Sequence, residues 1–373
     1  MPGDKPLADR RIRRQIKSGS RSHGLWPPNR AIVLEGEDRK GLTRAVKTRF
    51  GGYLVRKPDE PAVWTEELVE GELGAGDVLL RVRYSALNYK DALALTARGR
   101  VLRTFPVISG IDLAGEVVSS EDPRFAAGDR VFATGMGVGE EHSGGFAQYA
   151  RLPATKLQAL PPGLNFQTAM GLGTAGFTAM LAVFALEDHG VRPTQGEVLV
   201  TGAGGGVGGF AIALLAGRGF AVTAVTGRPA QAGYLRELGA AKVLDRSELA
   251  KPGKPLASER WQGSVDSVGG IILANVLAAM KRGGSVAACG NAGGAELPTS
   301  VFPFILRGVN LLGIDSVHCP ASSRARAWQA LAETPPGAAL EAMCRTEPLA
   351  RASALAADLL EGKVRGRVVL AVE

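Results

Sequence analysis

Short apolar runs separated by turn residues occupy the part of the chain that follows Phe50. The runs have the residue types of strands, and the proline and glycine residues between them are typical of turns. The expected strands are residues 52–56, 77–84, 115–118 and 129–133. Strands at this spacing, with few helices, predict a β-rich domain that ends near Gly171.

Beyond Gly171, apolar runs of strand length alternate with longer runs of helical length. The expected strands are residues 197–201, 221–225, 242–244, 264–268, 285–289 and 310–314, and the expected helices are residues 207–218, 230–238 and 272–280. Two more helical stretches follow Cys319, and a strand at residues 364–372 closes the chain. This alternation predicts an α/β fold, with a doubly wound parallel sheet of the Rossmann type covered by helices.

The composition is that of an ordinary globular protein, with 45% hydrophobic and 21% charged residues among 373. It excludes a wholly disordered, collagenous or coiled-coil chain. Glycine or charge interrupts the apolar stretches before the ~18 to 20 residues that a membrane span needs, so no transmembrane helix is expected. Three scattered cysteines are too few for a disulfide framework and favour a reducing compartment, which we take to be the cytoplasm.

The net charge of +8 comes entirely from an N-terminal extension, residues 1–49. This segment holds 13 Lys and Arg against 5 Asp and Glu, and the rest of the chain is neutral. Because the extension has little apolar periodicity, it is predicted to be disordered. A targeting or nucleic-acid role is the alternative for this extension, and the neutral body gives no reason to expect nucleic-acid binding.

A strand-like run that starts at Glu197 enters a glycine cluster, and the cluster opens an apolar helix. Only glycine lets the backbone turn this tightly and bring its amides up to a pyrophosphate at a helix N-terminus. The loop residues expected at a dinucleotide are Gly202, Ala203, Gly204, Gly205, Gly206, Val207 and Gly208. More than one register of the G-x-G-x-x-G pattern fits, and a purely structural glycine turn is the alternative. The order of strand, loop, helix and second strand favours dinucleotide binding.

The end of the second strand of this unit distinguishes the two nicotinamide cofactors. An NAD enzyme places Asp or Glu there for the ribose hydroxyls, whereas the 2′-phosphate of NADPH needs a cation. This chain has Thr226, Gly227 and Arg228 at that point. Arg228 can grip a phosphate bidentately and Thr226 can add a hydroxyl donor, so NADPH is favoured. The alternative is a solvated arginine ahead of Pro229.

A β-rich domain before a Rossmann domain, with a last strand that returns to the first domain, resembles the medium-chain dehydrogenase/reductase superfamily. Its zinc enzymes carry a G-H-E-x-x-G motif, which residues 110–115 match with Ile111 in place of the histidine ligand. The four histidines, His23, His142, His189 and His318, show no metal-ligand spacing with the cysteines. No metal is therefore expected. Reduction of a carbon–carbon double bond conjugated to a carbonyl needs no Lewis acid, because the carbonyl spreads the charge.

Several further motifs look like the acrylyl-CoA reductase family, a zinc-free, quinone oxidoreductase-like branch of this superfamily. They are residues 87–93, 110–115, 120–125, 173–180, 185–188, 286–290, 303–307 and 313–317. The resemblance covers Phe50 to Glu373. It implies a GroES-like catalytic domain at residues 50–171 and 316–373, a Rossmann domain at residues 172–315, and a homodimer.

The same resemblance implies residues at the cofactor beyond the glycine loop and Thr226 to Arg228. They are Tyr89, Arg246, Asn291, Ile305, Ser316 and Arg367. For Tyr89 it also implies a catalytic role, in which the hydroxyl orders the nicotinamide end or holds the substrate carbonyl. The alternatives are a core aromatic for Tyr89 and a surface arginine for Arg246.

Four positions depart from the family pattern. Met136 and Ser143 stand where the family usually has tryptophan, and Asn291 replaces a leucine. We expect these three near the substrate cleft. Ser323 replaces the first of two arginines and leaves Arg324, which could weaken a cationic contact to a CoA phosphate.

Together these features predict NADPH-dependent reduction of acrylyl-CoA, or a similar short enoyl-CoA, to propionyl-CoA. Hydride goes to the β-carbon and a proton to the α-carbon, with either Tyr89 or solvent as the proton source. The alternatives are an NADPH:quinone reductase on the same fold and a non-enzymatic NADPH-binding or RNA-binding protein, for which the basic extension is the only support.

Overall fold

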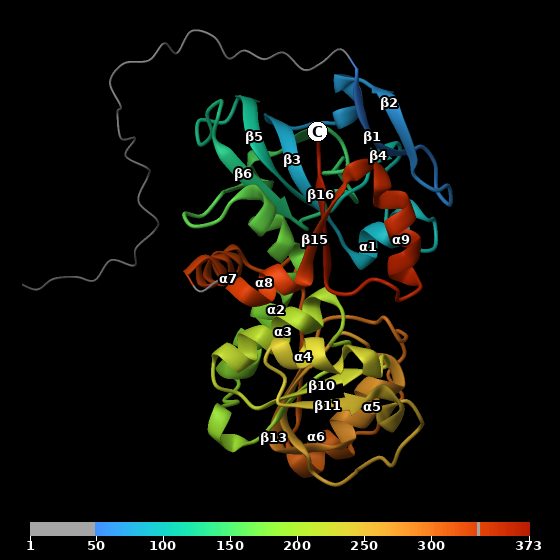
Figure 1. Ribbon diagram of the computed structural model, residues 1–373, viewed down its shortest axis with the longest axis vertical. Coiled ribbons are helices and arrows are strands. Elements are labelled where there is room, and N and C mark those ends of the chain that lie inside the picture. Colours follow the sequence, from blue (N-terminus) through green and yellow to red (C-terminus); the bar gives the residue numbers. More distant parts are fainter. Residues whose placement is uncertain (1–48, 334–335) are drawn as a thin grey trace, which may run out of the picture. The chain divides into compact units, whose positions relative to one another are not determined.

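The computed structural model describes residues 49–333 and 336–373. The basic extension predicted at residues 1–49, together with its expected disorder, lies outside the described residues except for Arg49. The described chain holds a mostly antiparallel sheet system and a parallel sheet, with helix α2 (Phe166–Asp188) between them (Figure 1). This arrangement confirms the predicted α/β class with a Rossmann-type sheet and a β-rich domain.

The β-rich domain contains two sheets. A three-stranded sheet has the order β2-β1-β4, and a seven-stranded sheet follows the path β15-β16-β3-β5-β6-β8 with β7 paired to β3. The strands are β1 (Phe50–Val55), β2 (Val63–Leu68), β3 (Val78–Leu87), β4 (Val107–Ile108), β5 (Asp112–Ser120), β6 (Arg130–Thr134), β7 (Tyr149–Leu152), β8 (Gln158–Ala159), β15 (Cys344–Pro348) and β16 (Arg367–Ala371). Each predicted strand is present, and β2, β4, β7, β8 and β15 are additional.

Strand β3 shows why these residues form a half-buried strand. Leu80 and Val82 are buried, whereas Arg81 and Arg83 between and after them are partly exposed, which is the alternation of a sheet with one covered face. The last strand, β16, lies between β15 and β3, and Val368 pairs with Leu87. The closing strand therefore returns to the first domain, as predicted.

The parallel sheet has the order β11-β10-β9-β12-β13-β14. Its strands are β9 (Val198–Val200), β10 (Val222–Thr226), β11 (Lys242–Asp245), β12 (Trp261–Asp266), β13 (Met280–Ala288) and β14 (Asn310–Gly313), and its helices are α3 (Gly206–Gly217), α4 (Ala232–Glu237), α5 (Gly270–Ala278) and α6 (Phe302–Arg307). The chain starts at β9 in the middle, runs outward to β11, and then crosses to β12. A ligand crevice is expected at this switch point, outside the carboxyl ends of β9 and β12.

Helix α2 is the longest helix and was not predicted, because its glycine-rich first half hides a helical pattern. The predicted domain boundary at Gly171 falls within it, and its backbone is kinked at Gly173 (φ 47°, ψ −155°). The helix is long and apolar enough to cross a membrane, but 78% of its most apolar window is buried inside the protein. Phe177 and Met180 share one core with Phe132 of the β-rich domain and Phe210 of α3. We therefore interpret α2 as a core helix shared by both domains. The predicted boundaries of the two domains stay predictions.

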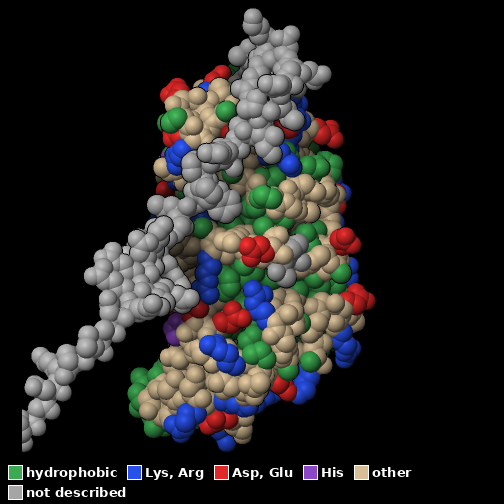
Figure 2. Space-filling model, turned by 90° about the vertical axis from the view of Figure 1, so that its left-hand side faces the viewer, with side chains coloured by type: hydrophobic (Ala, Val, Ile, Leu, Met, Phe, Trp, Pro, Cys, Tyr) green, Lys and Arg blue, Asp and Glu red, His purple; other side chains and the backbone are tan. Residues whose placement is uncertain are grey.

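Among the described residues, four further helices are connected in sequence to strands of the β-rich domain. They are α1 (Tyr89–Leu95), α7 (Ala321–Glu333), α8 (Gly337–Met343) and α9 (Ala352–Leu360). The last three follow Cys319, where two helical stretches were predicted. Helix α9 packs against α1, so the segment that leads into β16 lies beside the helix that starts at Tyr89. On the face shown in Figure 2, the basic and acidic side chains of the described residues are interspersed.

Candidate dinucleotide site

The glycine loop joins β9 to α3, as the sequence predicts. Gly202 has a positive φ of 61°, and a Cβ on it would collide with Ser267 Oγ. A Cβ on Gly208 would collide with the carbonyl oxygen of Gly202, so only glycine lets α3 approach the loop this closely. Helix α3 begins at Gly206, and its first amides have no partners within the helix. This loop and helix start form the cradle that a pyrophosphate requires.

A cavity of about 280 Å³ lies beside this loop. Its lining residues are Thr201, Gly202, Ala203, Gly204, Gly205, Val225, Thr226, Gly227, Arg228, Arg246, Val268, Ile272, Glu361 and Gly362. The structure thus brings together four predicted loop residues, the predicted Thr226 to Arg228 and the predicted Arg246. Thr201, Val225, Val268, Ile272, Glu361 and Gly362 were not predicted. Glu361 and Gly362 follow α9, far along the chain from the glycine loop, and no local pattern points to them.

Two arginines supply the positive charge of this cavity. Arg228 donates from Nη1 to the backbone oxygens of Gly362 and, at 3.4 Å, of Val364. The Arg246 guanidinium lies over Gly227, where a Cβ would sit 2.9 Å from its Cζ. Within residues 49–333 and 336–373, no hydrogen bond or ion pair engages the Arg246 side chain. Arg246 is therefore free to bind an anion in this cavity.

Thr201, Thr226 and Glu361 also line the cavity, and the Thr201 hydroxyl donates to Asp266 Oδ1 at 2.6 Å. The Thr226 hydroxyl oxygen accepts a hydrogen bond from the Arg228 backbone N–H at 3.1 Å, and its own proton stays available to a phosphate. Glu361 is exposed and pairs with Lys363 at 2.5 Å. The hydrogen bond from Lys363 lowers the pKa of Glu361, so this carboxylate stays ionised. No carboxylate stands at the end of β10 itself, which is the arrangement expected for NADPH.

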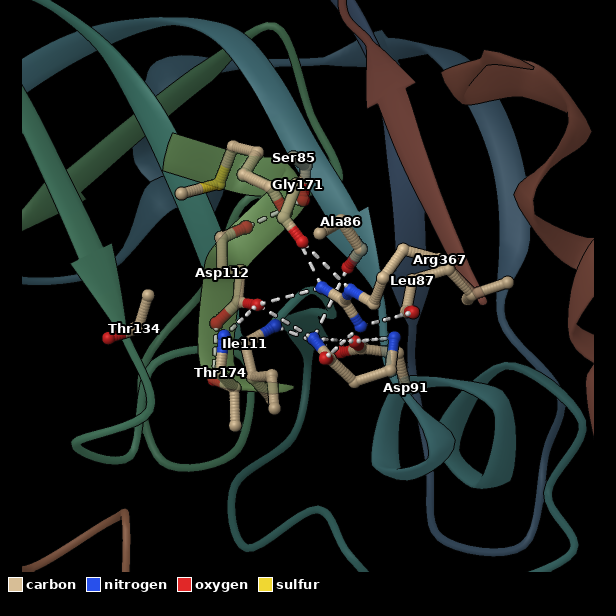
Figure 3. Close-up of polar contacts among 12 residues, drawn as sticks. Ser85, Ala86, Leu87, Asp91, Ile111, Asp112, Thr134, Gly171, Thr174 and Arg367 are labelled. Atoms are coloured by element: carbon tan, nitrogen blue, oxygen red, sulfur yellow. Dashed lines mark hydrogen bonds and ion pairs between the residues drawn. The ribbon is translucent and has the colours of Figure 1, made fainter. Parts of the chain in front are cut away.

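Arg367 lies next to the glycine loop, but its guanidinium points into the protein (Figure 3). It is 4% exposed, and it donates to the backbone oxygens of Gly171 at 3.2 Å and Leu87 at 3.3 Å. It also donates to Asn88 Oδ1 at 2.8 Å. Only its alkyl stem reaches the loop, with Cδ 2.6 Å from the Cβ position of Gly206. The guanidinium is therefore bonded inside the protein while the stem lies at the loop, and the predicted cofactor contact of Arg367 stays a prediction.

Two buried carboxylates, Asp91 and Asp112, lie near the Arg367 guanidinium and form with it a cluster of buried polar groups (Figure 3). Asp112 accepts hydrogen bonds from Asn88 Nδ2 at 2.9 Å and Thr174 Oγ1 at 2.5 Å, and Arg367 lies 3.7 Å away. Asp91 accepts from the backbone N–H groups of Asn88 and Ile111, both at 2.9 Å.

Burial, followed by the nearby charge of Asp112, raises the pKa of Asp91 to about 7. The meeting of these groups was not predicted, although Asn88 and Asp91 lie in the motif at residues 87–93 and Asp112 in the motif at residues 110–115.

Tyr89 is the first residue of α1 and directly follows Asn88. Its side chain is 45% exposed, which excludes the alternative of a core aromatic. Among the described residues, the Tyr89 hydroxyl has no hydrogen-bond partner, so it is available to a ligand. Its predicted catalytic and cofactor roles stay predictions.

Three other predicted cofactor residues lie outside the cavity. Asn291 is exposed in the loop after β13, and Ile305 is 68% exposed on α6. Ser316 is half-buried, and its backbone oxygen accepts from Arg324 Nη2 at 2.8 Å. Their roles at the cofactor stay predictions.

One departure from the family pattern, Ser143, and the retained Arg324 are both built into the fold. Ser143 is buried, and its hydroxyl accepts from the Ile108 N–H at 3.2 Å and donates to the Glu72 carbonyl at 3.1 Å. The Arg324 guanidinium is also buried, where it donates to Thr134 and Ser316. The Arg324 guanidinium is therefore engaged inside the protein, and the expected effect of Ser323 on a CoA phosphate contact stays a prediction.

The position that would hold zinc in related enzymes is occupied by a packed side chain. Ile111 is buried, and no cluster of three or more His, Cys, Asp or Glu side chains suited to a metal occurs in the part of the chain that the structure describes.

Comparison with known proteins agrees with this geometry. A zinc-binding dehydrogenase family model matches residues 206–333, and an alcohol dehydrogenase GroES-like domain model matches residues 74–162. The acrylyl-CoA reductase AcuI of Ruegeria pomeroyi is 52% identical over 343 residues, which cover 92% of this chain and 98% of that protein.

Two solved structures extend the comparison. The yhdH oxidoreductase of Salmonella enterica in complex with NADP has a TM-score of 0.84 and 49% identity, over 87% of this chain and 100% of that chain. The Bacillus subtilis protein yhfP with NAD bound has a TM-score of 0.82 and 44% identity, over 87% of this chain and 100% of that chain.

Proposed function

From the premise that this chain belongs to the acrylyl-CoA reductase family of the medium-chain dehydrogenase/reductase superfamily, we propose that it reduces acrylyl-CoA, or a similar short enoyl-CoA, with NADPH. The product is then propionyl-CoA or the matching saturated thioester. The chain is an oxidoreductase of the zinc-free branch, in which Ile111 occupies the position of a zinc ligand.

The observation that carries this proposal is the pair of arginines in the cavity beside the glycine loop. Arg228 and Arg246 both line it, and the end of β10 holds Thr226 in place of an acidic residue. A 2′-phosphate placed there would meet two cations and a hydroxyl, whereas a 2′-hydroxyl would leave both guanidinium groups without an anion. The family relative with NADP bound supports the same choice.

The residues of this chain hold and orient the reactants. Bound NADPH supplies the hydride that reduces the β-carbon. Gly202 and Gly208 let the start of α3 approach the pyrophosphate, and Arg228 and Arg246 hold the 2′-phosphate. Tyr89 is the first residue of α1, directly after the N-cap Asn88, and its free hydroxyl can bind the thioester oxygen as charge develops there. Either Tyr89 or solvent then supplies the proton to the α-carbon.

The test compares acceptors and cofactors side by side. NADPH oxidation is measured with acrylyl-CoA, with a quinone and with no acceptor, and we expect turnover with acrylyl-CoA far above the other two. A quinone preferred over acrylyl-CoA would establish the quinone reductase alternative instead.

Arg228→Ala tests the cofactor assignment. It should raise the KM for NADPH about 10- to 100-fold, because a hydrogen bond to a charged group contributes about 1.5 to 3 kcal/mol, and leave the KM for NADH nearly unchanged. The control is Arg260→Ala, since Arg260 is a partly exposed arginine of the same domain that does not line this cavity. Equal losses with both cofactors would contradict the assignment.

The homodimer is part of the same proposal and is supported by the edge of the parallel sheet. Among the strands described, β14 pairs with β13 alone, so its other edge carries unpaired backbone groups. Exposed apolar side chains gather on β14 and α6; they are Val301, Phe302, Ile305, Leu306 and Leu311. Such a patch beside an open strand edge suits pairing with a second copy about a twofold axis.

Ile305→Lys should convert the dimer to a monomer in analytical ultracentrifugation. Val63→Lys is the control, because Val63 is 64% exposed on β2 in the other sheet system. A dimer unaffected by Ile305→Lys would contradict this interface, and a raised KM for NADPH in the same variant would support the predicted cofactor role of Ile305.

The cytoplasmic location is likewise a proposal, supported by three free cysteines.

A further inference from the structure

Residues 361–366, here named the strap, connect α9 to β16 and lie against the glycine loop. The Gly366 N–H donates to the Gly204 oxygen at 3.0 Å, and the Arg365 guanidinium lies 4.6 Å from the ring centre of Tyr234 in α4. Glu361 and Gly362 line the dinucleotide cavity. A segment that leads into the last strand of the β-rich domain thus forms part of a cavity built by the Rossmann domain.

The strap also determines where Arg228 points. Arg228 Nη1 donates to the backbone oxygens of Gly362 and Val364, while Nη2 lies 3.2 Å from the Cβ position of Gly204 in the glycine loop. A guanidinium carries five N–H groups in one plane, so two carbonyls on one nitrogen fix the orientation of that plane. The remaining N–H groups then stay available on the side of the glycine loop, ready for an anion.

The strap carries a charge pair at the same cavity. Glu361 lines the cavity and pairs with Lys363 at 2.5 Å, and Lys363 lies 3.9 Å from Asp358 of α9. All three side chains are exposed, so salt screens their effect on a ligand. As a pair, Glu361 and Lys363 are neutral. Loss of either partner would leave a net charge beside a phosphate that carries up to two negative charges.

We propose that the strap is a specificity-determining part of the 2′-phosphate site. The carbonyl oxygens of Gly362 and Val364 position Arg228, and the pairing of Glu361 with Lys363 neutralises a carboxylate that would otherwise repel the phosphate. The preference for NADPH over NADH is then set by the catalytic domain as well as by the Rossmann domain. This inference rests on the proposed function, because it assumes that Arg228 binds the 2′-phosphate.

Gly362→Ala tests the positioning of Arg228. Gly362 has a φ of 70° and open space around its Cβ position, so alanine fits sterically but strains the backbone and shifts the carbonyl. We expect the kcat/KM ratio of NADPH over NADH to fall about 10-fold, the effect of one weakened charge-assisted hydrogen bond. Gly190→Ala is the matched control, because Gly190 has a φ of 81°, equally open space and no place in the cavity.

Glu361→Gln and Lys363→Gln test the charge pair without straining the backbone. Glu361→Gln should lower the KM for NADPH and Lys363→Gln should raise it, each about 2- to 5-fold because the groups are exposed. The KM for NADH should not change in either variant, and both effects should fade in high salt. Asp358→Asn is the control, because Asp358 also lies near Lys363 but does not line the cavity.

The strap proposal fails if Gly362→Ala changes NADPH and NADH alike, or if the two charge variants shift the KM in the same direction. These outcomes are distinct from a failure of the proposed function. If Arg228→Ala separates the cofactors and the strap variants do not, Arg228 binds the phosphate without help from the strap. If Arg228→Ala has no effect on NADPH, the assignment of the cavity itself is wrong.

Discussion

Arg367 donates a hydrogen bond of 2.8 Å to the side-chain oxygen of Asn88, the residue directly before Tyr89. This bond joins the last strand of the chain to the start of α1. The alkyl stem of the same arginine lies against Gly206, the first residue of α3. One buried side chain therefore contacts both the start of α1, at Tyr89, and the start of α3, where we propose that the pyrophosphate binds.

Removing the Arg367 side chain should damage the fold more than the cofactor site. Arg367→Ala leaves Asp112 without its buried cation and removes a donor from the buried carbonyl oxygens of Gly171 and Leu87. We therefore expect a loss of about 3 to 5 kcal/mol in the free energy of unfolding. Denaturant unfolding with and without NADPH measures this. Arg365→Ala is the control, because Arg365 is exposed and its guanidinium lies over the Tyr234 ring, so its removal should cost about 1 kcal/mol or less. A stable Arg367→Ala protein that has lost only NADPH binding would contradict this role.

The buried Asp91 should make stability depend on pH. Its pKa rises from 3.8 to about 7 on folding, so between these values the folded protein holds a proton that the unfolded chain releases. Stability from this group is therefore full at low pH and is lost as the pH rises toward 7. From pH 5.5 to pH 8 the loss should be on the order of 2 kcal/mol, since one pKa unit corresponds to about 1.4 kcal/mol.

Asp91→Asn removes the titrating group, so the stability difference between the variant and the wild type should change over this pH range. Denaturant unfolding at both pH values measures it. Asp358→Asn should keep the wild-type pH dependence. An identical pH dependence in Asp91→Asn would show that Asp91 is ionised throughout.

Tyr89→Phe separates the hydroxyl from the ring. Because no described residue bonds to this hydroxyl and the side chain is 45% exposed, the free energy of unfolding should change by less than about 0.5 kcal/mol. The kcat with acrylyl-CoA should fall about 10- to 1000-fold, which spans the loss of one hydrogen-bond donor and the loss of one general acid. An unchanged kcat would indicate that solvent supplies the proton and that Tyr89 only contacts the bound ligands.

Chelation should not affect the reaction. Ile111 cannot coordinate a metal, and its backbone N–H is engaged by Asp91 at 2.9 Å. Dialysis against a strong chelator should therefore leave the rate of NADPH oxidation unchanged, measured against a zinc-dependent alcohol dehydrogenase treated in parallel. A rate that falls and returns on addition of zinc would overturn the metal-free interpretation.

Deleting residues 1–47 should leave both the melting temperature and turnover nearly unchanged. The extension carries the whole net charge of +8. The structure of the relative from Salmonella enterica aligns over 100% of its own length, and the alignment covers 87% of this chain. Thermal unfolding and the acrylyl-CoA assay on the shortened protein measure this. Loss of folding or of activity would show that the extension is required for stability or for turnover.

The sequence by itself determined the features that depend on neighbours a few residues apart. The glycine cluster that opens α3 lies where it was predicted, because a tight turn with a positive φ at Gly202 can be built only from residues without a Cβ. Alternating strands and helices likewise identified the parallel sheet. The cation at the end of β10, Arg228, follows from the strand–loop–helix order alone.

Only the tertiary structure decided which distant groups meet. Arg367 and Asn88 are 279 residues apart in the sequence, and Arg228 and Gly362 are 134 residues apart. No local pattern could therefore show that Arg367 is bonded inside the fold or that the strap orients Arg228. The same holds for Asp91 of α1 and Asp112 of β5, which are both buried and both accept a hydrogen bond from Asn88 Nδ2. Backbone preferences act over a few residues, whereas burial, charge pairing and pKa depend on every segment that packs around a group.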